Sequence, residues 1–289
     1  MMERLTDLNT IRPLLARHGF HFSKTLGQNF LCADWVPERI AASAELDGET
    51  GVLEVGPGIG ALTVELAKRA KRVVCVELDR TLEGLLAETL AGLDNVETVF
   101  ADVMKTDLRA LTADRFSDCA RVVVCANLPY QITTPALTAF VQAGCFSRIT
   151  VMIQREVALR VCARENTADY GAFSVLMQWH TAPQICFDVP AGCFIPAPKV
   201  TSSVVTMERR AAPPAAVQSE ARLFAVVRAA FNQRRKTLCN ALNAGLGLPK
   251  ATVAAALAGL GLPESVRGEA LSVAQFAALS DALPAEKTD

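Results

Sequence analysis

Residues 52–60 read VLEVGPGIG, an apolar run that leads into three glycines spaced two residues apart. The run is typical of a buried strand, and the glycines predict a tight turn before a helix that begins near Ala61. Glycines let the backbone approach a ligand closely, and N–H groups at the start of a helix can bind polar groups. The turn is a candidate nucleotide site, although such a turn also uses glycine for steric reasons alone.

Four further short runs rich in β-branched residues have the pattern of strands buried on both faces. The predicted strands are 51–55, 72–77, 96–101, 121–126 and 149–153. Between them, residues 61–70, 82–90 and 135–141 carry apolar side chains at helical spacing. This alternation predicts an open, mostly parallel, doubly wound α/β sheet. Two later runs, 184–189 and 202–208, are joined by a short proline-rich loop and are expected to form an antiparallel pair.

A break in composition separates two parts of the chain. Residues 209–219 contain two adjacent prolines and predict a linker. We expect a main domain at 1–208, which includes an N-terminal extension at 1–33. The alanine- and leucine-rich residues 220–289 predict a small domain of three or four helices.

Composition limits the class of protein. The 289 residues carry 29 Lys and Arg against 30 Asp and Glu, which excludes a uniformly basic nucleic-acid-coating protein. No apolar run approaches the ~20 residues that a membrane span needs, and charges near the N-terminus argue against a signal peptide. Nine cysteines without a C-x-x-C pair and three histidines predict free structural thiols and no metal site. We expect a cytoplasmic, monomeric protein with no membrane association.

Acidic residues near the strand ends refine the expected ligand. Glu77 ends the second predicted strand, where a carboxylate can accept hydrogen bonds from both hydroxyls of a ribose, and Asp102 follows the third. Each alone is also compatible with an ordinary solvated carboxylate. Glu54 lies two residues before the first glycine, a position unfavourable for a dinucleotide's pyrophosphate but suited to the ammonium of S-adenosylmethionine. The pattern therefore favours S-adenosylmethionine over NAD.

The fourth predicted strand leads into Asn127, Leu128, Pro129 and Tyr130. The Asn127 side-chain oxygen and a backbone carbonyl can accept hydrogen bonds from the exocyclic amine of adenine, which favours the pyramidal, nucleophilic form of that amine. Tyr130 would then stack on the base. Asn-x-Pro is also a routine turn, but the neighbouring cofactor motifs favour the amine interpretation.

Seven motifs occur in the order found in rRNA adenine N6-dimethyltransferases. They are GQNFL (27–31), LEVGPGIG (53–60), VELD (76–79), AD (101–102), NLPY (127–130), FIPAPKV (194–200) and FNQRRK (231–236). The chain resembles most the KsgA/RsmA family, which dimethylates two adjacent adenosines near the 3′ end of 16S rRNA. The Erm enzymes, which act on 23S rRNA, share these motifs, but FNQRRK followed by a helical tail is typical of the 16S group.

The resemblance implies a class I S-adenosylmethionine-dependent methyltransferase fold, Rossmann-like, with an antiparallel last strand and a helical C-terminal domain. The expected cofactor-binding residues are Gln28, Asn29, Leu31, Glu54, Gly56, Gly58, Glu77, Asp102 and Asn127. The implied catalytic residues are Asn127, Leu128, Pro129, Tyr130 and Phe194. The proline-bracketed loop predicts a rigid, partly exposed Phe194 ring that stacks on the target base, rather than a core aromatic.

Residues 220–250 hold six basic residues and one acid. If this stretch is helical, Arg228 and Arg235 share one face, opposite an apolar face. A charged face is usually only solvated, but this local excess favours RNA phosphate contact by Arg228, Arg235 and Lys236. Cys239 stands where the family commonly has an arginine, so we expect one fewer phosphate contact. The expected partner is 16S rRNA or an immature small ribosomal subunit.

Two alternatives are weighed against this interpretation. An NAD-dependent oxidoreductase is disfavoured by the glycine spacing and by the lack of an obvious His or Tyr-Lys acid. A non-catalytic RNA-binding assembly or transcription factor could keep the same fold. The presence of Glu77, Asp102, Asn127 and Tyr130 argues against lost catalysis.

Overall fold

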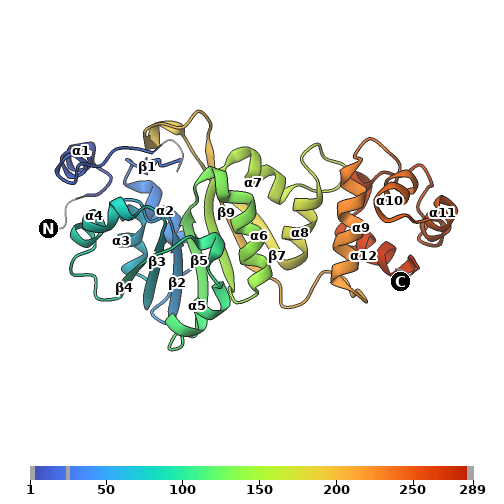
Figure 1. Ribbon diagram of the computed structural model, residues 1–289, viewed down its shortest axis with the longest axis horizontal. Helices are drawn as coiled ribbons and strands as arrows, with labels where there is room; N and C mark the ends of the chain where they lie inside the picture. The colour runs from blue at the N-terminus through green and yellow to red at the C-terminus, as the bar shows by residue number, and fades with distance from the viewer. Residues whose placement is uncertain (1–3, 24–26, 285–289) are drawn as a thin grey trace. The chain divides into compact units, whose positions relative to one another are not determined.

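The computed structural model describes residues 4–23 and 27–284 and contains a seven-stranded sheet (Figure 1). The strand order is β4-β3-β2-β5-β6-β9-β7. The strands are β2 (Thr50–Val55), β3 (Arg72–Glu77), β4 (Val96–Phe100), β5 (Arg121–Asn127), β6 (Arg148–Gln154), β7 (Thr181–Val189) and β9 (Ser202–Arg209).

The strand directions confirm the predicted sheet. Strands β4, β3, β2, β5 and β6 are mutually parallel along the sheet. Strand β9 runs antiparallel to β6, with Val205 opposite Val151. Strand β4 differs from the expectation of burial on both faces, because all of its residues are only half-buried. It is an edge strand, with a neighbour on one side alone.

Helices cover the sheet as the alternating pattern predicts. The helices that precede β6 in the chain are α1 (Leu8–Arg17), α2 (Trp35–Ser43), α3 (Ala61–Ala67), α4 (Glu83–Thr89), α5 (Leu108–Arg115) and α6 (Thr133–Ala143). Ile40 of α2 and Leu66 of α3 pack against Val52, Val73 and Val123 of the sheet. Helix α6 lies in front of the strands in Figure 1 and buries Phe140.

The sequence pattern did not predict a second, two-stranded sheet. It pairs β1 (Phe30–Leu31) with β8 (Phe194–Ile195) in antiparallel register, with Leu31 opposite Phe194. The predicted proline-rich loop therefore contains a short strand. That strand joins two motifs that are far apart in the chain.

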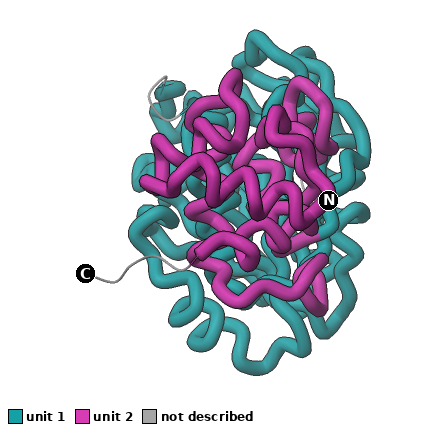
Figure 2. The backbone as a smooth tube through the Cα atoms, turned by 90° about the vertical axis from the view of Figure 1, so that its right-hand side faces the viewer, with its two compact units in different colours: residues 1–158, 182–209 teal, residues 159–181, 210–289 magenta. Residues whose placement is uncertain are grey.

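The chain divides into two compact units, one of residues 1–158 with 182–209 and the other of residues 159–181 with 210–289 (Figure 2). The main domain predicted at 1–208 includes residues 159–181, which the structure groups with the second unit. In the structure Tyr170 and Trp179 instead share a core with Leu223 and Phe276, and the Tyr170 hydroxyl donates to the Leu271 carbonyl over 2.9 Å. Helical spacing shows that a segment has an apolar face but does not show which core that face joins.

Helices build the second unit. They are α8 (Ala172–His180), α9 (Glu220–Asn232), α10 (Leu238–Leu246), α11 (Lys250–Gly259) and α12 (Val273–Ala282), while α7 (Arg155–Cys162) crosses the division between units. Ser219 caps α9 by accepting from the Arg222 N–H, as serine commonly does at a helix start. Among the helices of residues 4–23 and 27–284, none is long and apolar enough to span a bilayer.

Candidate active site

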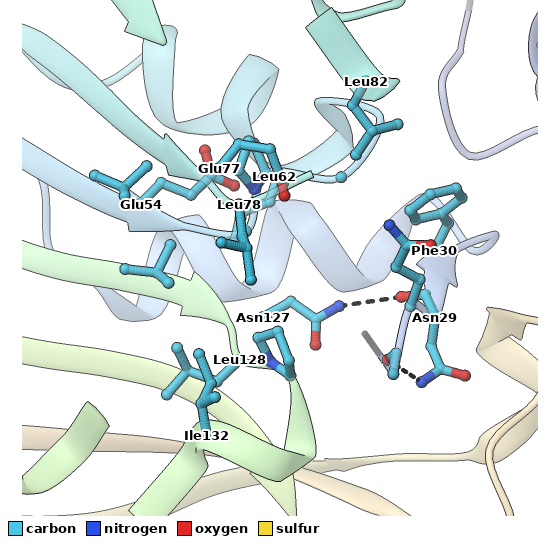
Figure 3. A pocket seen from close by; sticks show the side chains of 18 of the residues that line it. Asn29, Phe30, Glu54, Leu62, Glu77, Leu78, Leu82, Asn127, Leu128 and Ile132 are labelled. Atoms are coloured by element: carbon cyan, nitrogen blue, oxygen red, sulfur yellow. Dashed lines mark hydrogen bonds between the residues drawn. The ribbon is translucent and has the colours of Figure 1, made fainter. Parts of the chain in front are cut away.

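A cavity of about 220 Å³ lies beyond the carboxyl ends of β2, β3, β4 and β5 (Figure 3). In a parallel α/β sheet this edge is where ligands bind, because loops from adjacent strands meet there. Every residue that the sequence predicted to bind the cofactor or the target base lines this one cavity. They are Gln28, Asn29, Leu31, Glu54, Gly56, Gly58, Glu77, Asp102, Asn127, Leu128, Pro129, Tyr130 and Phe194.

The glycine turn shapes the floor of the cavity. Gly56, Gly58 and Gly60 have φ angles of +67°, +61° and +88°, which L side chains rarely adopt. The Gly56 N–H donates to the Val76 carbonyl over 2.9 Å and so joins the turn to β3. A Cβ on Gly58 would lie 3.1 Å from the Phe30 ring. Glycine is thus required both by the backbone conformation and by the closeness of Phe30.

Glu54 lies at the end of β2, and its side chain is 1% exposed. The Cys75 thiol of β3 donates to Glu54 Oε2 over 3.4 Å, and the Thr63 side chain of α3 also hydrogen-bonds this carboxyl. Burial raises the pKa of Glu54 to about 7, even though both hydrogen bonds favour the charged form. The sequence indicated Glu54 but neither of its supporting residues.

Glu77 ends β3 and is 6% exposed. Its Oε1 accepts from the Asp79 N–H over 2.8 Å, and backbone N–H groups of Gly58 and Leu78 also donate to the carboxylate. Burial raises the pKa of Glu77 above its usual value despite these donors. The backbone therefore fixes the direction of this carboxylate at the cavity wall.

Asp79 and Gln28 form a contact that the sequence analysis did not foresee. Gln28 Nε2 donates to Asp79 Oδ2 over 2.6 Å, and Gln28 Oε1 accepts from the Ser23 N–H over 3.0 Å. Asp79 belongs to the VELD motif, which was the only signal for it. The contact holds the residues that precede β1 against the turn that follows β3.

Asp102 follows β4 and caps the short helix η2 (Val103–Lys105). Its Oδ1 accepts from the Met104 N–H over 2.9 Å, and Lys105 Nζ lies 3.5 Å from Oδ2. These contacts orient the carboxylate, and the exposed Leu78 lines the same cavity.

Asn127 ends β5 and points toward the segment that contains β1 (Figure 3). Its Nδ2 donates to the Asn29 carbonyl over 3.3 Å, so the Oδ1 atom remains as an acceptor. The Leu128 N–H donates to the Met152 carbonyl over 3.2 Å and anchors the loop to β6. The side-chain amide is thereby oriented toward the segment that leads into β1.

The two aromatic candidates are placed differently. The Tyr130 hydroxyl lies 2.7 Å from Ser202 Oγ of β9, and burial raises the pKa of this hydroxyl. Phe194 is 4% exposed and packs with Leu31 and Val36, so the expectation of a partly exposed ring is wrong. The ring is buried because β8 pairs with β1, although the residue still lines the cavity.

The described charged residues that line the cavity are all acidic. Glu54, Glu77 and Asp102 are among its described lining residues, and no Lys, Arg or His is. Such a lining suits a cationic ligand and is unfavourable for a pyrophosphate. The acidic lining of the cavity therefore fits S-adenosylmethionine, which carries an ammonium and a sulfonium, better than it fits NAD.

Five basic residues between 222 and 236 fall into two groups by their contacts. Arg222 donates to the Ser280 and Leu283 carbonyls at the end of α12, and Arg234 donates to the Ala168 carbonyl and lies 3.8 Å from Glu269. Arg228, Arg235 and Lys236 form the second group and are exposed.

The expected helical face shared by Arg228 and Arg235 is wrong, because α9 ends at Asn232 and Arg235 lies in the turn beyond it. Cys239 is 3% exposed, and its thiol donates to the Glu264 carbonyl. Cys239 therefore packs inside the unit and not on the surface where a phosphate contact would form.

Comparison with known proteins agrees with the motifs and the fold. Residues 19–283 match the family model described as ribosomal RNA adenine dimethylase. The chain is 44% identical to ribosomal RNA small subunit methyltransferase A of Streptococcus sanguinis (strain SK36) over 287 residues, which cover 98% of this chain and 99% of that protein. The protein of the same name from Geobacillus thermodenitrificans (strain NG80-2) is 44% identical over 278 residues, covering 94% of each chain.

Two solved structures share the fold. The 23S rRNA methyltransferase ErmE has a TM-score of 0.67 and 29% identity, covering 88% of this chain and 99% of that one. A dimethyladenosine transferase from Plasmodium falciparum has a TM-score of 0.73 and 23% identity, covering 86% and 95%. Since the family model spans nearly all of the chain and the relatives match it almost end to end, this protein belongs to the ribosomal RNA adenine dimethylase family.

Proposed function

We propose that this protein is an S-adenosylmethionine-dependent methyltransferase that dimethylates N6 of two adjacent adenosines near the 3′ end of small-subunit rRNA. The observation that carries the proposal is the placement of Asn127, whose amide is held by the Asn29 carbonyl in the same cavity as the glycine turn and Glu77. The 44% identity to proteins named for the small subunit, against 29% to a 23S enzyme, supports the choice of RNA.

Different residues of the cavity bind different parts of the cofactor. S-adenosylmethionine, when bound, supplies an electrophilic methyl group on a sulfonium. Glu77 accepts hydrogen bonds from the ribose hydroxyls, and Glu54 faces the ammonium. Asp102 with its neighbouring apolar side chains receives the adenine. Gln28, Asn29 and Leu31 enclose the methionine end together with Gly56 and Gly58.

The NLPY loop prepares the target amine. Asn127 Oδ1 accepts one amine hydrogen. The Leu128 carbonyl accepts the other, because the Pro129 carbonyl already accepts from Ile132 N–H and Thr133 Oγ1 over 3.2 Å each. Two acceptors localise the nitrogen lone pair away from the ring, and a fixed position aligns that lone pair for attack. No strongly basic side chain is needed for this step.

The two aromatic rings hold the base itself. Ser202 fixes the Tyr130 hydroxyl, so that the ring is ready to stack on adenine without first losing conformational freedom. Phe194 is buried in the β1–β8 strand pair, but it also lines the cavity and can contact the base there. We assign it the opposite side of the base, as a rigid wall.

The second unit binds the RNA backbone in this proposal. Arg228, Arg235 and Lys236 are exposed and available for phosphates, whereas Arg222 and Arg234 bind carbonyls of their own unit. The protein acts as a monomer in the cytoplasm, on 16S rRNA or an immature small subunit.

Methylation of defined RNA substrates tests the proposal. We expect labelled methyl groups to appear on N6 of two neighbouring adenosines of unmethylated small subunits, and none on 23S rRNA. Methylation of 23S rRNA alone would contradict the choice of RNA. RNA binding without any methyl transfer would favour the non-catalytic alternative, and tight NAD binding would contradict the cofactor assignment.

A further inference from the structure

Glu54 is an acid buried in the sheet whose hydrogen bonds come from two different elements. The Cys75 thiol donates to its Oε2 over 3.4 Å from β3, and Thr63 hydrogen-bonds the carboxyl from α3. Cys75 and Thr63 also contact each other, with 3.9 Å between Sγ and Oγ1. All three side chains are buried, while Glu54 also lines the cavity. The carboxyl therefore contacts two buried side chains and also belongs to the lining of the ligand site.

The surroundings of Glu54 contain no compensating positive charge among the described residues. Glu77 on β3 is a second carboxylate near it, and Cys125 on β5 is a buried thiol on its other side. Burial and the charge of Glu54 raise the pKa of the Cys75 thiol well above its usual value, so this thiol stays protonated and acts as a donor. A cationic ligand in the cavity would supply the positive charge that these residues lack.

We propose that Thr63 and Cys75 are positioning residues that orient the Glu54 carboxyl toward the ammonium of the ligand, and that ligand binding expels one proton from this carboxyl. The inference rests on the proposed function, because it requires a ligand of the S-adenosylmethionine class. The O–H bond of the carboxylic acid breaks, its proton passes to the solvent buffer, and the ammonium of the ligand keeps its own protons.

The physical reason is the change in charge around a buried acid. In the ligand-free protein burial holds the pKa of Glu54 at about 7, so much of the group is neutral at neutral pH. A cation beside the carboxyl favours the ionised form and lowers this pKa. Affinity then rises with pH, because fewer molecules must lose a proton in order to bind. For one group that titrates near pH 7, affinity increases by about eightfold between pH 6 and about pH 7.5.

Two ligands separate Glu54 from Glu77 as the source of the proton. S-adenosylhomocysteine keeps both the ribose and the ammonium, whereas methylthioadenosine keeps the ribose and lacks the ammonium. Calorimetry in buffers of different ionisation enthalpy measures the protons released. Near pH 6.5, roughly 0.8 proton is expected for S-adenosylhomocysteine and close to none for methylthioadenosine. Equal release by both ligands, or release by neither, would overturn the proposal.

A matched pair of variants tests the positioning role of Cys75. Cys75→Val and Cys125→Val make the same change in neighbouring buried strands, but only Cys75 has a hydrogen bond to Glu54. Cys75→Val should move the midpoint of the affinity–pH profile upward by roughly half a unit, since the charged carboxylate loses a donor. Cys125→Val should leave the midpoint unchanged, and Cys75→Ser, which keeps a donor, should restore the parental profile.

The outcomes separate this inference from the proposed function. No binding of S-adenosylhomocysteine to the parental protein would contradict the proposed cofactor. Normal binding without proton release would contradict the role of Glu54, whatever the variants do. If the proton release is present but Cys75→Val and Cys125→Val have the same pH profile, the positioning role of Cys75 is wrong. The first measurement uses the unmodified protein, so it does not depend on any variant folding.

Discussion

Replacing Glu77 by Gln removes a charge at the cavity wall and keeps the length of the side chain and one of its two oxygens. The carboxylate is 6% exposed, and the Asp79 N–H donates to its Oε1 over 2.8 Å. Glutamine keeps one oxygen for the N–H groups of Asp79, Gly58 and Leu78, while its amide nitrogen cannot accept from them, so a small loss of stability at the turn after β3 is expected. Glu77 lines the cavity, and we place the ribose hydroxyls at the acceptor positions that these backbone groups leave open. Hydrogen bonds to a charged group contribute roughly 1.5–3 kcal/mol in such sites, more than those to a neutral amide.

The expected loss in cofactor affinity is about 1–3 kcal/mol, which corresponds to roughly 5- to 150-fold. Calorimetry with S-adenosylhomocysteine measures it, and thermal unfolding of the ligand-free variant checks that the fold is retained. Glu83→Gln is the matched control, because Glu83 is an exposed acid in the first turn of α4, away from the described lining of the cavity. This control should bind the cofactor as tightly as the parental protein does.

A cofactor analogue without ribose hydroxyls makes the test specific. Such an analogue should bind the parental protein and Glu77→Gln with similar affinity, since the interaction in question is absent from both complexes. A folded Glu77→Gln variant that binds S-adenosylhomocysteine with parental affinity would refute the ribose assignment. An equal loss of affinity for the analogue would show that the variant acts on the cavity in general.

Asn127→Ala should lower the single-turnover methylation rate by about 100-fold or more, and cofactor affinity should fall far less, because Asn127 is one of nine residues expected around the cofactor. A variant that reacts at the parental rate would contradict its role as an acceptor. The Arg228→Ala, Arg235→Ala double variant should bind RNA more weakly, with a slope of log affinity against log salt that is smaller by roughly 0.7–0.9 per lost contact; an unchanged slope would mean that these side chains are only solvated. Arg234→Ala should instead lower the unfolding temperature, because Arg234 binds the Ala168 carbonyl, and normal stability with a reduced salt slope would reverse the two assignments. The unfolding free energy of the ligand-free protein should fall by about 3 kcal/mol as pH rises from 4.5 to about 7, because the folded pKa of Glu54 is raised to about 7 and the unfolded acid ionises first. Glu54→Gln should remove this part of the pH dependence, and an identical profile in the variant would contradict the assignment.

The local pattern of the sequence was sufficient for the parallel sheet and for the family. Buried strands of β-branched residues, each followed by a polar motif, predict loops that meet at one edge of the sheet, because parallel strands all end on the same side. Glu77 and Asn127 are far apart in the chain but line one cavity for this reason. The motif order alone was enough to recognise the ribosomal RNA adenine dimethylase family.

Contacts between distant segments could not be derived in this way. Phe194 was expected to be partly exposed because its loop is rich in proline, but the pairing of β8 with β1 buries it. Helical spacing predicts Arg235 on the same helix face as Arg228, but α9 ends at Asn232, before this residue. Nothing in the local sequence marks Thr63 and Cys75 as partners of Glu54, since each is an ordinary residue of a helix or a strand.

The sequence by itself determined which segments become strands and helices, where the glycine turn lies and which polar residues gather at the strand ends. These properties depend on side-chain periodicity and backbone conformation within a few neighbouring residues. Only the tertiary structure decided that residues 159–181 join the helical unit, that Phe194 is buried and that Glu54 lies between a thiol and a hydroxyl. Burial and charge environment depend on which surfaces meet in space, and many partners far away in the chain satisfy the same local pattern.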